Sequence, residues 1–519
     1  MDNSSAMSHR HHLDEARYYE QRQNKDACLH EESKRRKMIR WIKKRFNLQD
    51  ELQRAPPAPV FPRDHPSMNK RMNWVQSTRM TAGNQFSDEA AVAGSSETST
   101  TAKSQPRPST PEHHAHVIIV GAGVGGLCLA QGLKKHGIPF TVFERDPSPN
   151  YRSQGYRVRI DSTGYEALKA NLSANNVEVL LRAAGHYLPA VDYLNARTGK
   201  AEVDKEEYEQ HQPSNRASLL SHHHIFSPDR AMLRSLLLAD LDDDEVQFGM
   251  AFKRYEYLPN GRVLVTFENG KTVQGTVLVG ADGTTSRVRR QYIPRSITLL
   301  DTDTGAIYGK TPRTPALEAL FSPNSSTIVL CDNPLMSLIV EPRGRTSVDL
   351  AEFHMGNDMC DYIGWALISR AQNFHQDPNL SARELFSLPP EEIAELSIEM
   401  TRGWDPRIHA LLTQQIPDWC VLLRICSMAP DLHRWEPSSV TLLGDAVHTM
   451  APAGIGCNTA LYDAQMLVKN FCKLGVNVEA IARYEHELRA AGREGITLSF
   501  DACEKMYGLP PVQDMHVVR

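Results

Sequence analysis

The most regular pattern of apolar positions starts with a short uninterrupted run from Val117 to Val120. A Gly-rich stretch over residues 121–126 follows without a gap, and apolar side chains then recur at helical spacing from Leu127 to Leu133. A second apolar run, Phe140 to Phe143, ends in the acidic residue Glu144. Uninterrupted apolar runs are typical of strands that are buried on both faces of a parallel sheet. The pattern therefore predicts a strand, a Gly-rich turn, a helix and a second parallel strand.

The glycines of this turn indicate a dinucleotide-binding site. Gly121 permits the tight turn, Gly123 lets a pyrophosphate approach the backbone, and Gly126 lets the helix pack closely on the strand. The start of the helix offers free N–H groups and a partial positive charge to the phosphates. Glu144, placed at the end of the second strand, is suited to accept hydrogen bonds from a ribose. A bare GxGxxG string is often only a turn, but here the strand, helix, strand and acid accompany it.

A second candidate lies at the end of an alternating region over residues 246–281. The alternation and the Asn269-Gly270 pair predict a β-meander with a hairpin turn. A buried strand from Thr276 to Val279 then runs into Asp282 and Gly283. Such an Asp-Gly pair, taken alone, is more often an ordinary turn than a site.

A third candidate occupies residues 438–471. A buried strand, Val440 to Leu443, runs into Asp445, and a helix is predicted to start near Asn458. The loop between them carries Pro452, Gly454 and Gly456. A strand end beside glycines and a helix start is again a place where a ligand can use free N–H groups. The alternative is that Asp445 merely caps the loop.

Two arginines accompany these motifs. Residues 156–160 alternate apolar and charged side chains, which predicts a half-buried strand containing Arg157, with a helix starting near Thr163. Residues 227–241 predict a helix capped by Ser227 or Asp229, with Arg230 in its first turn. Because a cation opposes the helix dipole there, Arg230 suggests an anionic contact, although a surface salt bridge would also account for it.

The remaining chain divides by composition. Residues 300–430 carry several β-type runs and one helical segment, which predicts a sheet-rich second portion over 299–435. The flanking parts, 113–298 and 436–472, would form an interleaved Rossmann-like portion, and 473–519 a C-terminal helical tail. The predicted fold class is therefore α/β, with a sheet-rich portion inserted into a dinucleotide-binding one.

Residues 1–112 are polar and end in a Ser/Thr/Pro-rich stretch, which predicts a disordered extension. Its basic segment, 34–46, is consistent with nuclear targeting or with docking on an anionic surface. We favour the simpler reading of a solvated tail helix, because isolated basic runs are usually solvated.

Composition and charge limit the partners and the cellular location that the sequence predicts. A formal net charge of −4 over 519 residues favours neither nucleic acid nor an anionic membrane as partner. Nine scattered cysteines without a CxxC pair predict reduced thiols in an intracellular, cytoplasmic protein. The N-terminus lacks a secretory pattern, and no stretch is long and apolar enough for a transmembrane segment. The histidine clusters at 9–12 and 222–224 are too local to converge on an ion, so no metal site is predicted.

Together, three motifs resemble those of the group A flavoprotein monooxygenases, the family of para-hydroxybenzoate hydroxylase and of many natural-product hydroxylases and epoxidases. They are GAGVGG with Glu144, GADGTTSRVR over 280–289, and GDAVHTMAPAGIGCNTALYDA over 444–464. The resemblance covers residues 116–470 in order and spacing, and the third motif is long and specific.

The resemblance implies FAD as cofactor and assigns a part of it to each motif. The nucleotide half of FAD would be held by Gly121, Gly123, Gly126 and Glu144. Asp282 and Gly283 would serve both FAD and the pyridine nucleotide. Asp445 would bind the ribityl chain or the pyrophosphate, and Arg230 would contact the flavin cofactor. The segment that would wrap the isoalloxazine ring contains Pro452, Gly454, Gly456 and Asn458. Arg157 lies where related sequences approach the flavin edge.

The implied activity is that of a monooxygenase that uses NAD(P)H and O2 as co-substrates. In the family, reduced flavin forms a C4a-hydroperoxide, and its distal oxygen is delivered to an organic substrate. We expect a hydrophobic or aromatic small molecule of secondary metabolism as substrate, and a monomer or homodimer as the assembly. No residue is predicted as a catalytic acid or base, since these groups vary among members.

Two alternatives stay open at this stage. A flavin-dependent halogenase shares the FAD fold, but neither Trp365 nor Trp404 lies in the WxWxIP setting typical of halogenases. A non-catalytic FAD-binding redox sensor or scaffold, recruited through the basic segment 34–46, belongs to a different class. Baeyer–Villiger, epoxidising and hydroxylating outcomes are all compatible with the motifs.

Overall fold

The computed structural model describes the part of the chain that carries the three motifs. The chain separates into two units, Met1–His113 and His114–Arg519. All described residues belong to the second unit; they are 115–149, 151, 157–184, 190–201, 226–321, 325–342, 362–374 and 382–518. The predictions for the extension 1–112, its basic segment and both histidine clusters lie outside these residues, as does the β-type run at 346–355.

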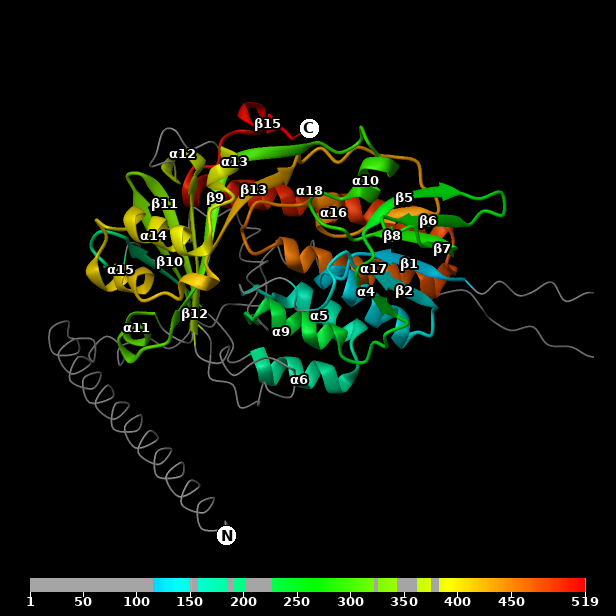
Figure 1. Ribbon diagram of the computed structural model, residues 1–519, viewed down its shortest axis with the longest axis horizontal. Helices are drawn as coiled ribbons and strands as arrows, with labels where there is room; N and C mark the ends of the chain where they lie inside the picture. Colours follow the sequence, from blue (N-terminus) through cyan, green and yellow to red (C-terminus); the bar gives the residue numbers. More distant parts are fainter. Residues whose placement is uncertain are drawn as a thin grey trace, which may run out of the picture. The chain divides into compact units, whose positions relative to one another are not determined.

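A five-stranded parallel sheet contains the strands that precede the three motifs (Figure 1). Its order is β14-β8-β1-β2-β4, and β1 pairs in parallel with both β2 and β8. The predicted strands around the Gly-rich turn are confirmed with the expected bounds. The strands of this sheet are β1 Val117–Val120, β2 Phe140–Phe143, β4 Val246–Gln247, β8 Val277–Gly280 and β14 Val440–Leu442.

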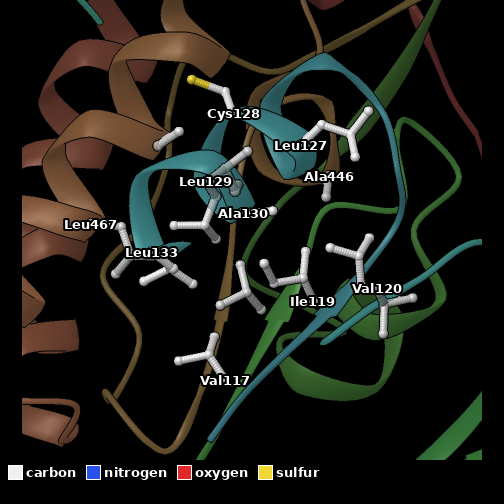
Figure 2. Close-up of a cluster of buried hydrophobic side chains, with 14 of the residues drawn as sticks. Val117, Ile119, Val120, Leu127, Cys128, Leu129, Ala130, Leu133, Ala446 and Leu467 are labelled. Carbon is white, nitrogen blue, oxygen red and sulfur yellow. The ribbon is translucent and has the colours of Figure 1, made fainter. Parts of the chain in front are cut away.

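Helices cover this sheet and form the first hydrophobic core with it. Figure 2 shows how Leu127, Leu129 and Leu133 of one helix face Ile119 of β1, with Leu467 of another helix beside them. Each of these five side chains is fully buried, so the apolar spacing that predicted the helix marks its packed face. The helices are α4 Val124–Lys135, α5 Ser162–Asn171, α6 Ala174–Ala184, α9 Arg230–Leu238, α17 Gly456–Leu474 and α18 Val478–Tyr507.

A second, seven-stranded sheet follows the order β13-β9-β12-β11-β10-β3, with β15 added on β9. Its pairings are antiparallel except for the parallel pair β10 and β3. Its strands come from residues 190–517, and the boundaries proposed for the two portions remain a prediction. The strands are β3 Ala190–Asn195, β9 Leu299–Pro312, β10 Ser325–Asp332, β11 Leu335–Pro342, β12 Tyr362–Arg370, β13 Val421–Met428 and β15 His516–Val517.

Short helices pack on one face of the second sheet and bury Trp365, Leu338 and Ile363 in a separate core. On the other face, the last turns of α18 contribute Met506 and Tyr507 to a third cluster. The helices of this region are α11 Pro315–Leu320, α12 Ala371–Phe374, α13 Ala382–Leu385, α14 Pro390–Met400, α15 Pro406–Thr413, η3 Pro417–Trp419 and η4 Val512–Asp514.

The predicted β-meander forms a small antiparallel sheet of β5 Phe252–Tyr257, β6 Val263–Phe267 and β7 Thr272–Gly275. Gly270 has φ 83° in the turn between β6 and β7, as the Asn-Gly pair predicted. Two short helices, α10 Arg287–Tyr292 and α16 Asp445–His448, follow β8 and β14.

The strand predicted over 156–160 is wrong in its type among the described residues 157–160. Only two isolated bridges form, between Arg157 and Asp229 and between Ile160 and Phe226. Val158 and Ile160 are buried while Arg157 is half-buried, so the alternation reports burial correctly. The segment pairs only with residues 226–229, which is too short a partner for a regular ladder. The helix predicted over 227–241 is shorter than expected, because it starts at Arg230 and ends at Leu238.

The helices of the described residues include none that combines the length and apolarity needed to cross a membrane.

Candidate functional site

Two glycines of the first motif are required by packing. Gly121 has φ 113°, and a Cβ on it would lie 2.3 Å from the carbonyl oxygen of Ala281. A Cβ on Gly126 would lie 2.2 Å from the carbonyl oxygen of Gly121. Both distances are shorter than real Cβ contacts, so only glycine fits at these positions. They bring β1, α4 and the end of β8 into close contact.

Gly123 differs from its neighbours because the space beside it is open. A Cβ on Gly123 would meet no atom within 4 Å. Gly123 is the N-cap of α4, and no side chain of the described residues caps this helix. The first N–H groups of α4 thus face a space that an anion can enter, and the helix dipole favours negative charge there. This geometry fits a dinucleotide pyrophosphate.

Glu144 is held directly beside this turn at the end of β2. Its Oε2 accepts a hydrogen bond from the backbone N–H of Ala122 at 2.7 Å, and its Oε1 accepts one from Asp146 at 3.0 Å. The side chain is 8% exposed. A carboxylate has about four acceptor positions, so two bonds leave capacity for ribose hydroxyls. The structure therefore brings the predicted acid and the Gly-rich turn together.

Asp282 lies at the end of β8 and faces α10. Its Oδ1 accepts from the Ser286 hydroxyl at 2.5 Å, and its Oδ2 accepts from the N–H of Arg287 at 2.7 Å. Burial raises the pKa of this carboxyl, although the hydrogen bonds oppose the shift. Gly283 follows with φ 77° and open space beside it. Within the chain, Asp282 binds the N-cap residue Ser286 and the first N–H groups of α10, and its predicted cofactor contact stays a prediction.

Arg289 ties the second motif to the third. Its Nη1 donates to the carbonyl oxygen of Ala446 at 2.7 Å, and its Nη2 donates to that of Thr284 at 2.8 Å. The hydroxyl of Thr449 donates a hydrogen bond to the hydroxyl of Thr284, at 3.1 Å. Burial lowers the pKa of Arg289 to about 10. The arginine therefore stays charged near neutral pH and fixes the two motifs against each other.

Asp445 is exposed and is the first residue of α16, and its side chain lies near the start of α17. Its Oδ1 is 4.0 Å from where a Cβ on Gly456 would be, and Gly456 is the first residue of that helix. No described side chain caps α17. A Cβ on Gly125 would lie 2.5 Å from Leu443 and 3.3 Å from Ala460, so the first turns of α4 and α17 are neighbours. Two uncapped helix starts thus converge beside the ends of β1 and β14.

Asn458 braces the loop of the third motif. Its Nδ2 donates to the carbonyl oxygens of Arg159 at 2.9 Å and Gly454 at 3.0 Å, and its Oδ1 accepts from the N–H of Asp161 at 3.0 Å. Gly454, with φ 75°, forms the turn beside it, and Pro452 is half-buried in the same loop. Because the Asn458 amide is committed to backbone groups, its contribution to a ligand site is to position the loop.

Arg230 and Arg157 are both neighbours of Asp229. Arg230 follows Asp229 in the sequence, and Arg157 forms an isolated β-bridge with it. Arg230 begins α9, and its charge lowers the pKa of Cys457 in the first turn of α17. Burial is the larger effect and raises that pKa to about 12. Arg157 is directed toward β12, where its Cδ is 3.3 Å from the position of a Cβ on Gly364. Among the described residues, nothing pairs with the buried Nε of Arg157.

The third motif also holds a buried ion pair that was not predicted from the sequence. Nε2 of His448 lies 2.6 Å from Oδ2 of Asp463, and the same oxygen accepts from the N–H of Gly444 at 2.9 Å. Burial alone would lower the pKa of His448, but the carboxylate of Asp463 outweighs it and the pKa is raised. Both residues lie within the quoted motif, but their spacing carried no signal that they pair.

The described residues contain no group of three or more His, Cys, Asp or Glu side chains able to hold a metal ion.

Comparisons with known proteins agree on one group. The model of the NAD(P)-binding Rossmann-like domain matches residues 119–181. A solved structure of a FAD-containing monooxygenase from Photorhabdus luminescens is 30% identical, with a TM-score of 0.60, and the match covers 76% of this chain and 98% of that one. Klebsiella pneumoniae HpxO, solved with FAD and uric acid, is 20% identical with a TM-score of 0.59, which shows the fold alone.

Curated relatives come from fungi. The dual O-methyltransferase/FAD-dependent monooxygenase elcB of Phaeosphaeria nodorum is 31% identical over 79% of this chain and 48% of its own length. The protein CTB3 of Cercospora beticola has the same dual description and is 32% identical over 76% of this chain and 46% of its own length. The chain thus spans about half the length of these relatives. The FAD-dependent monooxygenase phnB of Penicillium herquei is 25% identical over 78% of this chain and 94% of its own length.

Proposed function

The chain belongs to the family of FAD-dependent monooxygenases, and we propose that it inserts one oxygen atom from O2 into a hydrophobic or aromatic small molecule of secondary metabolism. NAD(P)H is proposed as the reductant. The observation that carries the proposal is the convergence of three sequence-distant motifs at the ends of β1, β8 and β14, beside two uncapped helix starts.

The residues present fit FAD in order along the site. The open space at Gly123 and the start of α4 would take the pyrophosphate, and Glu144 would take the adenosine ribose. Asp445, exposed in α16 near the start of α17, would bind the ribityl chain or the pyrophosphate linker. Arg230 would contact the flavin cofactor, Arg157 would approach the flavin edge, and the loop from Pro452 to Asn458 would wrap the ring.

The reaction divides between cofactor and chain. When bound, FAD accepts a hydride from NAD(P)H and activates O2 for transfer of one oxygen atom. The uncapped start of α17 presents a partial positive charge, which would favour negative charge on a cofactor bound beside it. The role of the chain's own residues is then to orient the substrate and to exclude water from the reacting atoms.

An apolar substrate is supported by the face of the second sheet that meets the third motif. Ala453 of the third motif, Tyr193 and Tyr308 pack against the buried cluster that contains Ala451, and each of the three remains partly exposed. Such a surface suits aromatic and alicyclic molecules and disfavours small charged ones. The dual description of elcB and CTB3 supports a phenolic or polyketide-like molecule, of a kind that an O-methyltransferase also accepts.

An intracellular, cytoplasmic location and a monomeric or homodimeric assembly are part of the proposal. All cysteines of the described residues are free, which fits a reducing compartment. The product of the reaction distinguishes hydroxylation, epoxidation and Baeyer–Villiger chemistry.

The test is a purification of the full chain followed by a visible absorption spectrum and FAD titration. Gly123→Ala should weaken FAD binding by about tenfold or more without loss of stability, because its Cβ fills only the space proposed for the pyrophosphate. Gly403→Ala is the matched control, since Gly403 is exposed and a Cβ there meets its nearest atom at 3.8 Å.

Turnover is then measured as NADPH or NADH consumption with a panel of aromatic and polyketide-like compounds. A product heavier by one oxygen atom, labelled from 18O2, supports the monooxygenase. A halogenated product that forms only with chloride would instead identify a flavin-dependent halogenase. Bound FAD that neither NADPH nor NADH reduces would favour the redox sensor. A chain that binds no flavin would overturn the proposal at its first step.

A further inference from the structure

Lys310 of β9 is a fully buried cation at the second sheet. Its side chain is 2% exposed, and its Nζ lies 3.2 Å from Oδ2 of Asp229. The ring centroids of Tyr362 and Trp419 lie 4.1 and 4.2 Å from the same Nζ. The hydroxyl of Tyr362 donates to Oδ2 of Asp229 as well. An ammonium group is buried at high cost unless it is paired in this way, so the arrangement is specific.

Asp229 uses its other oxygen for a different element. Oδ1 accepts from the N–H groups of Ala231 at 2.8 Å and Met232 at 3.2 Å, which makes Asp229 the N-cap of α9. One carboxylate therefore joins the start of α9 to β9 and β12 of the second sheet. Asp229 itself is 6% exposed, so water screens these bonds weakly.

The elements joined by Asp229 belong to different cores. Leu233 and Leu237 of α9 are buried in the core of the parallel sheet. Trp365 of β12 and Ile307 of β9 are buried in the separate core of the second sheet. The contact between Asp229 and Lys310 thus spans from the proposed FAD-binding portion to the proposed substrate portion.

Two arginines of the candidate site depend on the same place. Arg230 follows Asp229 directly, and its charge reaches Cys457 at the start of α17. Arg157 forms its β-bridge with Asp229 and packs on Gly364, which is the partner of Lys310 in the register of β12 with β9. A shift of Asp229 would therefore move both arginines relative to Asp445 and the third motif.

We propose that Lys310, Asp229 and Tyr362 form a clamp, called here the α9 clamp, that holds Arg230 in position to bind FAD. The proposal rests on the proposed function, because it requires FAD at the site. Lys310 and Tyr362 are positioning residues in this scheme, and they act on the cofactor through Arg230 from the side of the substrate sheet.

The experiment is a double-mutant cycle on the full chain, with the dissociation constant of FAD as readout. Lys310→Met keeps the length of the side chain but removes its charge, and should weaken FAD binding by about tenfold. Arg230→Gln should weaken it by a similar factor. If the clamp acts through Arg230, Lys310→Met should change FAD affinity by less than about threefold in the Arg230→Gln background.

A purely structural ion pair would behave differently. Asp301→Asn is the matched control, because Asp301 is a buried carboxylate on the same strand, and it pairs with Arg424 at the other end of β9. We expect this variant to lower the melting temperature while leaving FAD affinity within about twofold of wild type. Titrations are run well below the melting temperature of every variant, so that unfolding does not mimic weaker binding.

Tyr362→Phe serves if Lys310→Met does not fold, since it removes only the hydroxyl and keeps the ring under Lys310. It should weaken FAD binding by about threefold in the wild-type background. In the Arg230→Gln background it should have little further effect on FAD affinity. Unchanged FAD affinity in Lys310→Met or Tyr362→Phe, or effects that add fully to Arg230→Gln, would overturn the clamp. Failure of the wild-type chain to bind FAD would instead count against the proposed function.

Discussion

The imidazole of His448 and the carboxylate of Asp463 form a buried pair behind the third motif, with Nε2 and Oδ2 2.6 Å apart. The two residues lie on different helices, α16 and α17, and both side chains are at most 1% exposed. Because the same carboxylate oxygen binds the N–H of Gly444, the pair fixes the turn that presents Asp445.

This pair predicts a dependence of stability on pH. The folded-state pKa of His448 is raised, so its contribution is fully present below the unfolded value of about 6.5 and is lost as the pH rises through the folded pKa. Asp463→Asn should lower the free energy of unfolding at pH 6 by about 3 kcal/mol and should flatten its decline above pH 6.5. Denaturant titrations at several pH values measure both effects.

The control for that experiment is Asp431→Asn. Asp431 and His433 form a similar pair at 3.3 Å, but their side chains are 65% and 70% exposed. An exposed pair contributes little to stability, so this variant should match wild type at every pH. An unchanged pH profile in Asp463→Asn would contradict the prediction.

A second pH effect is predicted for Glu485 of α18. Burial raises its pKa to about 7, although the hydroxyls of Thr441 and Tyr292 donate to it. A raised acid pKa means that the folded state holds the proton more tightly, so stability falls as the pH rises from about 4.5 to about 7. Glu485→Gln should remove this fall and should stabilise the protein at pH 8 by roughly 2 kcal/mol.

Calorimetric or denaturant unfolding of wild type and Glu485→Gln at pH 5 and pH 8 measures this change in stability. Glu504→Gln on the exposed side of the same helix is the control and should leave the profile unchanged. Glu485→Gln that is less stable than wild type at pH 8 would show that the carboxylate is ionised and satisfied in the folded protein.

Glycine substitutions in the first motif should separate folding from binding. Gly126→Ala places a methyl group 2.2 Å from a backbone oxygen and should lower the free energy of unfolding by about 2 kcal/mol. Gly123→Ala meets no atom within 4 Å and should unfold like wild type. Thermal unfolding without added flavin measures the difference, and equal melting temperatures for the two variants would argue against the described turn.

Asn458→Ala should weaken both the fold and the proposed site. The change removes three hydrogen bonds that join α17 to Arg159, Asp161 and Gly454, at about 2 kcal/mol in total. Asn470→Ala is the control, because Asn470 is about equally buried in α17 but, among the described residues, its amide bonds within its own helix, to Met466. FAD affinity should fall in Asn458→Ala and not in Asn470→Ala; equal affinities would separate the brace from the site.

How far the sequence predicts the fold depends on the environment of each strand. β1 and β2 were predicted with their bounds because they are short, wholly apolar and flanked by glycines or an acid. β12 was missed: nearly every residue is buried, and it includes Tyr362 and Ser369 without any alternation. A strand that is covered on both faces and also carries polar side chains resembles neither standard pattern.

The site shows the same division between local and long-range information. The Gly-rich turn, Glu144 and the cap of α9 by Asp229 depend on neighbours along the chain, and the sequence predicted their placement. The contacts of Lys310 with Asp229 and of His448 with Asp463 join different elements, and packing rather than spacing creates them. Lys310 lies in a strand that mixes polar and apolar residues, so its position in the sequence gave no sign that its partner would be the cap of a distant helix.

Helix α18 has a consequence for how the chain comes apart. Its early residues, among them Tyr484 and Leu488, are buried with the parallel sheet, while Cys503 and Tyr507 are buried with the second sheet. If either sheet unfolded, the half of α18 that packs on it would expose its apolar side chains to water. The parallel sheet and the second sheet should therefore unfold together, as a single calorimetric transition rather than two.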